Sequence, residues 1–228
     1  MLSASSLFTF VVSSLLLFPV LTAAAPAADF AALTVIPYGR QSYDIATGLT
    51  VLADGGEVQD RERGISLAGA VVRLREGVFI ELEQARARGD SGGDFGGGLS
   101  EVKAERIRLE PASQTLFAEG KVELVRGGLS ASAERLRVFF EDGVLVAEEV
   151  RSEAPALSGR ALVVDLHSGA ALLVGPYRLE DGPLSLVSMR ADDLLELDLA
   201  GAGDALGVTV STEPDPQRVA RLGAYLRQ

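Results

Sequence analysis

The chain has 228 residues, 47% of them hydrophobic and 23% charged, which is typical of a folded domain and excludes wholesale disorder. It has no cysteine, which excludes disulfides, thiol chemistry and cysteine-ligated metals, and its single histidine leaves little room for a histidine relay. The net charge of −11 and the absence of tryptophan argue against a nucleic-acid partner. Mainly non-enzymatic functions remain, and we expect no cofactor.

The N-terminus reads as a secretion signal. Residues 7–21 form an uncharged apolar run, and small residues follow it. A run of about 15 residues is short for a membrane span and typical of a signal h-region, although no lysine or arginine precedes Arg40. We expect residues 1–28 to be a signal peptide, cleaved between Ala24 and Ala28, that places the rest in the periplasm. An uncleaved N-terminal membrane anchor is the alternative.

The body of the chain, residues 29–200, shows short alternating runs without helical periodicity, which is typical of many short strands. From Leu116 to Leu124, apolar or small residues alternate with charged ones, and Phe117 is an apolar exception on the charged face. The runs 195–199 and 78–82 alternate in the same way, with Val78 on the apolar face of the second. Such alternation indicates an antiparallel sheet with one buried face and one solvated face.

These runs also repeat along the chain. Residues 104–109 (AERIRL) match residues 133–138 (AERLRV), and weaker copies begin at Ala161 and Ala191. Turn signals at 111–113, 141–143 and 167–169 follow the first three copies. Each unit is therefore predicted to be strand–turn–strand, and the units are predicted to stack.

Each copy contains a slip in its alternation. The apolar residue after the leading alanine stands three positions on, rather than two or four. A slip at the same place in every unit predicts a recurrent β-bulge, which would curl the sheet into a trough or a partly open barrel. Its interior would be lined by Val, Leu, Ile and Ala, and its exterior by Glu, Arg and Asp.

The remaining segments break the pattern. Residues 89–98 are expected to form a flexible loop, and their two aspartates only faintly resemble a calcium-binding repeat. Residues 201–228 are expected to form a loop with a short strand at 208–210 and a short C-terminal helix. Asp215 and Pro216 would cap that helix, with Val219, Leu222 and Leu226 on one face. The helix would either plug one end of the sheet or lie free.

No catalytic motif stands out, so the protein is not expected to be an enzyme. The adjacent acidic pairs 148–149 and 192–193 would point to opposite faces of a strand, and His167 is expected at the surface. Four arginines alternate with apolar residues and should point outward to balance glutamates: Arg106, Arg108, Arg135 and Arg137.

Several short motifs resemble those of the OstA-like family. Residues 43–48 (YDIATG) with 55–58 (GGEV) resemble the opening of its domains, and residues 102–107 and 117–124 resemble its repeated strands. The resemblance covers roughly residues 35–200. The family includes the periplasmic LptA and LptC proteins of lipopolysaccharide transport.

The resemblance implies an all-β fold, a curved antiparallel β-jellyroll that forms an open, V-shaped trough. It also implies a bridge component that carries lipopolysaccharide or another envelope lipid toward the outer membrane. Its edge strands would dock to another copy or to other transport-bridge proteins.

Parity along the strands predicts the residues that would line such a trough. They are Ile107, Leu109, Leu116, Val122, Leu124, Leu136, Val138, Val164 and Leu166. Two other interpretations stay open. These residues could form an ordinary closed core without a ligand. The chain could also be a self-associating envelope β-solenoid that carries no lipid.

Overall fold

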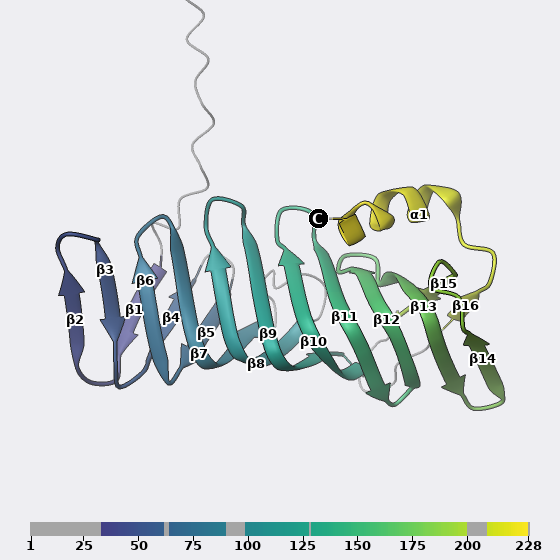
Figure 1. The fold of residues 1–228 in the computed structure, drawn as a ribbon, viewed down its shortest axis with the longest axis horizontal. Coiled ribbons are helices and arrows are strands. Elements are labelled where there is room, and N and C mark those ends of the chain that lie inside the picture. The colour runs from purple at the N-terminus through teal and green to yellow at the C-terminus, as the bar shows by residue number, and fades with distance from the viewer. Residues whose placement is uncertain (1–32, 62–63, 90–98, 128, 200–208, 228) are drawn as a thin grey trace, which may run out of the picture.

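The computed structural model describes residues 33–61, 64–89, 99–127, 129–199 and 209–227, most of which belong to one antiparallel sheet (Figure 1). A short helix, α1 (Pro216–Gly223), and a 3₁₀ turn, η2 (Tyr225–Arg227), follow the sheet. The strands are β1 (Leu33–Pro37), β2 (Gln41–Asp44), β3 (Leu49–Leu52), β4 (Gly56–Asp60), β5 (Ile65–Gly69), β6 (Val71–Arg75), β7 (Phe79–Gly89), β8 (Leu99–Glu110), β9 (Thr115–Arg126), β10 (Leu129–Phe139), β11 (Val144–Glu153), β12 (Ala156–Asp165), β13 (Ala170–Asp181), β14 (Leu184–Ser188), β15 (Leu194–Asp198) and β16 (Thr209–Ser211). The predicted all-β fold with a short C-terminal helix is confirmed.

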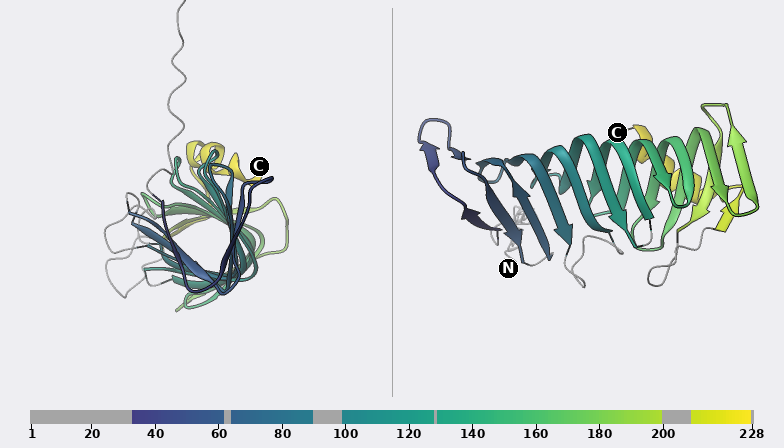
Figure 2. Two further views of the ribbon diagram at one scale, coloured as in Figure 1. Left: turned by 90° about the vertical axis from the view of Figure 1, so that its left-hand side faces the viewer. Right: turned by 90° about the horizontal axis from the view of Figure 1, so that it is seen from below.

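The sheet has two arms that meet at a corner. β7 pairs with β6 through residues 79–83 and with β5 through residues 86–89. At the other end, β13 pairs with β15 through residues 170–174 and with β14 through residues 177–181. The first arm therefore runs β2, β3, β6, one half of each strand from β7 to β13, β15 and β16. The second arm runs β1, β4, β5, the other halves and β14. Seen end-on, the two arms curl around an interior (Figure 2).

A local irregularity produces the corner in each long strand. The register shifts between Lys103 and Arg106 in β8 and between Ala133 and Arg135 in β10. In β7, β9 and β11, which alternate with these strands in the sheet, Gln84, Lys121 and Glu149 have positive φ angles of 47°, 48° and 54°. In β7, β8, β10 and β11 the irregularity shifts the alternation by one position, and in β9 the alternation continues across it, so that both halves of each bent strand direct apolar residues inward. The bulge predicted from the first two copies of the repeat is confirmed.

The prediction that the third copy of the repeat begins at Ala161 is wrong. In β12 the shift lies between Gly159 and Ala161, so Gly159 occupies the place of Ala104 and Ala133. Residues 161–165 are all buried, and Val163 contacts a second apolar cluster on the outer side of the sheet. Because both faces of this stretch are apolar, alternation could not reveal which residues point inward.

The interior is one continuous hydrophobic core, to which both arms contribute from Leu52 in β3 to Leu199 beyond β15. Leu195, Leu197 and Leu199 lie in it as predicted. Val78 does not, because it lies in the turn between β6 and β7 and is 47% exposed.

The connections are hairpins. The predicted turns lie at residues 111–114, 140–143 and 166–168, and they join β8 to β9, β10 to β11 and β12 to β13. Every pairing between described strands is antiparallel. This connectivity disfavours a solenoid of parallel coils.

The C-terminal helix packs on the outer face of the first arm, so the two expected positions, an end plug or a free helix, are both wrong. Leu222 is fully buried against Val144, Val146, Val163 and Leu172, which come from β11, β12 and β13. Val219 and Leu226 flank the same patch, as their shared face predicted. The outer side of these strands is apolar and needs a cover, which α1 supplies (Figure 1).

A substitution at Gly175, which lies at the corner of β13, would show how closely the backbones pack there. A Cβ at this position would lie 2.0 Å from the carbonyl oxygen of Arg190, and the Gly175 N–H donates to Asp193 at 2.9 Å. Gly175→Ala must push these backbones apart, and we expect it to lower the free energy of unfolding by about 1–3 kcal/mol in urea titrations. Gly223→Ala is the control, because nothing lies within 4 Å of the added methyl. Equal unfolding midpoints for the two variants would contradict this account of the corner.

Candidate functional site

The nine residues predicted to line a trough all lie in the interior core. None is more than 4% exposed, and all belong to the same cluster. Val122 and Leu124 come from the second arm. The other seven come from the first arm and face them across the core. They are Ile107, Leu109, Leu116, Leu136, Val138, Val164 and Leu166.

Alternation in the sequence places Leu82 on the apolar face of residues 78–82 but misses other members of this interior. Leu82, Leu145, Leu162 and Leu173 are 0–1% exposed and belong to the same cluster. The change of alternation within β11, between Ala147 and Val150, would have located Leu145. Parity also continues from Val122 and Leu124 to Arg126, which places a charged side chain on the inward face.

Side chains fill this interior. The cavity between β1, β4, β5 and the β8–β9 turn has a volume of about 10 Å³, which is enough for about one water molecule. Leu33, Val58, Leu109 and Leu116 are among its lining residues. A lipid chain could therefore enter this end of the core only if the two arms moved apart.

Arg126 connects the two arms on the side opposite the corner. It ends β9 in the second arm, and its side chain is buried, with 8% of the residue exposed. Nη1 donates to the carbonyl oxygen of Leu199 at 3.2 Å, and Nη2 donates to that of Leu166 at 3.4 Å. Nε is buried without a hydrogen-bond partner. Burial lowers the pKa of the Arg126 guanidinium, and the carboxylates of Asp165 and Asp198 partly offset this.

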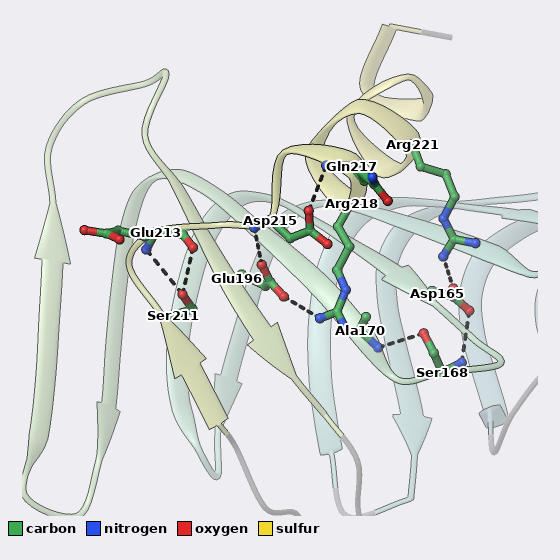
Figure 3. Close-up of polar contacts among 10 residues, drawn as sticks. All are labelled: Asp165, Ser168, Ala170, Glu196, Ser211, Glu213, Asp215, Gln217, Arg218 and Arg221. Carbon is green, nitrogen blue, oxygen red and sulfur yellow. Dashed lines mark hydrogen bonds and ion pairs between the residues drawn. The ribbon is translucent and has the colours of Figure 1, made fainter.

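Polar contacts hold α1 in place at both of its ends (Figure 3). At its N-terminus, Asp215 caps the helix by accepting from the Gln217 N–H at 2.9 Å. Arg218 pairs with Glu196 of β15, which also accepts from the Asp215 N–H at 2.7 Å. One turn further on, Arg221 pairs with the buried Asp165 of β12.

Among the carboxylates that hold α1 in place, Asp165 accepts the most hydrogen bonds. It also accepts from the backbone N–H groups of His167 at 2.9 Å and Ser168 at 3.0 Å. Burial alone would raise the pKa of Asp165. The hydrogen bonds from Ser168, Arg221 and His167 outweigh burial and lower the pKa from 3.8 to about 2.

The outer face of the sheet carries ion pairs between neighbouring strands. Arg106 pairs with Glu119 at 2.8 Å, and Arg135 pairs with Glu148 at 3.3 Å. The outward direction and the balancing role predicted for these arginines are confirmed. The predicted surface position of His167 is also confirmed, since its side chain is 67% exposed. The described residues include no group of three or more His, Asp or Glu that could hold a metal ion. Asp90 and Asp94 lie outside the described residues.

The two ends of the sheet are its edges and its most apolar surfaces. Among the described strands, β1 and β2 at one end and β14 and β16 at the other each pair with a single neighbour. Seven of the nine large hydrophobic residues exposed in the described chain lie at these ends. They are Val35, Ile36, Tyr38, Tyr43 and Ile45 near β1 and β2, and Val187 and Met189 near β14.

The sequence matches no protein-family model and no curated protein. Among solved structures, the chain is similar to LptH from Pseudomonas aeruginosa, described as the LptA-homologous periplasmic component of the lipopolysaccharide transport device. The TM-score is 0.43 and the sequence identity is 14%. The match covers 51% of this chain and 81% of that one. Separately, no helix within the described ranges has the length and apolar character needed to span a membrane.

The lowered pKa of Asp165 predicts an acid-sensitive anchor. Its ionised form stabilises the folded protein above about pH 4, and this contribution of about 2 kcal/mol should disappear as the pH falls through about 2. Asp165→Asn should therefore be less stable than wild type at pH 6, and the difference should shrink toward pH 2 in denaturant titrations. The exposed Glu134→Gln serves as the control and should follow wild type. A stability difference that stays constant with pH would refute the assignment.

Proposed function

We propose that the protein is a periplasmic bridge component that carries lipopolysaccharide or a related envelope lipid toward the outer membrane. The observation that carries this proposal is the continuous apolar interior between the two arms. It extends along the sheet between two ends that both present edge strands. A secretion signal at residues 1–28, outside the described residues, would deliver the chain to that compartment.

The mechanism would be physical rather than chemical. Each methylene of an acyl chain gains about 0.8 kcal/mol when it leaves water for an apolar surrounding. Because side chains fill the interior, the arms must separate along the side opposite the corner before a chain can enter. The nine predicted lining residues would then exchange contacts with one another for contacts with lipid. A row of such subunits would offer acyl chains a continuous apolar path.

The edge strands would extend this path from one copy to the next. β2 begins next to the corner, after residues 38–40, and runs away from the corner. β16 is antiparallel to β15 and runs toward the corner. Head-to-tail stacking would therefore pair β16 with β2 in the antiparallel sense. β14 and β1 both run toward the corner, so they would pair in the parallel sense. The exposed apolar residues at both ends would be covered by such contacts.

A second candidate function is a self-associating envelope scaffold without lipid cargo. The filled interior favours it, since a closed core needs no ligand to be stable. The same edge strands would serve either function. Bound lipid is therefore the property that separates the two.

Native mass spectrometry of the protein purified from its own envelope tests the cargo. We expect lipid-sized adducts on the bridge component, whereas lipid-free subunits would favour the scaffold. A lipid with a photoreactive diazirine on its acyl chain then tests the lining. Crosslinks should fall on inward residues such as Leu116 and Leu136, and the neighbouring outward residues Phe117 and Arg137 provide the control on the same strands.

Val187→Lys tests the docking edge. Val187 lies on β14 and is 61% exposed, and a lysine on an edge strand discourages pairing with another chain. We expect self-association to weaken about tenfold in analytical ultracentrifugation, equivalent to about 1.4 kcal/mol. Phe117→Lys is the control, because Phe117 is also exposed but lies on β9 in the middle of the sheet. The same loss in both variants would argue against an edge-specific contact.

A further inference from the structure

Arg126 occupies an inward-facing position of β9, and the other inward-facing positions of this half of β9 carry apolar side chains. It continues the inward face of Val122 and Leu124, and the core cluster surrounds that face. Burying a guanidinium costs several kcal/mol unless its charge and donors are satisfied. A buried arginine at this position therefore lowers the stability of the fold, and stability alone does not explain its presence.

Its present partners satisfy it incompletely. A guanidinium has five N–H donors. In the structure two of the donors are used, on neutral carbonyl oxygens, and the bonds of 3.2 and 3.4 Å are long for N–H···O bonds. Nε has no partner despite its burial. The carboxylates of Asp165 and Asp198 raise the pKa of Arg126, and Asp165 is already bound by His167, Ser168 and Arg221.

We propose that Arg126 binds the anionic headgroup of the lipid whose acyl chains enter the interior. Hydrogen bonds between a guanidinium and a phosphate or carboxylate are charge-assisted and often bidentate, and they are about twice as strong as bonds to neutral acceptors. Arg126 lies on the side opposite the corner, where the polar end of an amphiphile with buried chains would remain. This inference rests on the proposed function of lipid binding.

Headgroup binding would also help the arms to separate. The carbonyls of Leu166 and Leu199 belong to the first arm, and Arg126 belongs to the second. An anion that takes their place on the guanidinium removes a polar contact between the arms. The same exchange therefore recognises the headgroup and frees the entrance for its chains.

The experiment compares two lipids with identical acyl chains, anionic phosphatidylglycerol and zwitterionic phosphatidylcholine, on the full chain in a fluorescence displacement assay. Wild type should prefer the anionic lipid by at least about tenfold. Arg126→Met should lose this preference while still binding phosphatidylcholine, and Arg126→Lys, which keeps the charge without the planar fork, should be intermediate. Arg106→Met is the matched control, because Arg106 is an outward arginine paired with Glu119, and it should behave as wild type.

Different failures separate the two proposals. Equal binding of both lipids by wild type, or a preference that persists in Arg126→Met, would overturn the role of Arg126 and leave lipid carriage intact. Binding of neither lipid by wild type would overturn both. If Arg126→Met does not fold, a reduced preference in Arg126→Lys supports the assignment, and full retention of the preference opposes it. Inorganic phosphate is the last probe, and binding as tight as that of the anionic lipid would overturn the assignment to a lipid headgroup.

Discussion

The structure depends on one constraint, which is that a bent strand must keep apolar side chains on the same side before and after the bend. A regular strand of twelve residues has one continuous inward set, and folding it into two arms requires a local change in the backbone. The register shifts of β8, β10 and β12 and the positive φ angles of Gln84, Lys121 and Glu149 supply that change strand by strand. Because they lie side by side, they form one corner along the molecule, and the core between the arms follows from it.

The same geometry creates a tension between stability and cargo. Leucine, valine and alanine side chains from the two arms meet closely enough to leave little free space, which stabilises the empty protein. A lipid path needs those contacts to be exchangeable. The side opposite the corner is the natural place for exchange, since Arg126 bridges the arms there through weak bonds to backbone carbonyls. The stability of the closed form and the uptake of lipid would therefore be set by the same few contacts.

Beyond the corner, the sheet is asymmetric along its length. Both ends have short edge strands and exposed apolar residues. Only near the β14 and β16 end is the first arm apolar on its outer side as well, and there α1 covers that patch, held by Asp165 and Glu196. The helix thus protects a surface that would otherwise invite association, while the adjacent β14 edge stays open.

Alternation and turn residues in the sequence were enough to predict the all-β class, the hairpin turns, the bulge in the first two copies and the inward direction of the nine core residues. Each of these depends on alternation or turn chemistry within a few residues. By contrast, the register of β12, the position of α1 and the partners of Arg126, which lie 40 and 73 residues away, emerge only in the folded chain. Alternation gives no direction where both faces of a strand are buried. Contacts between the two arms depend on how all the intervening strands pair with one another, so no short stretch of sequence predicts these contacts.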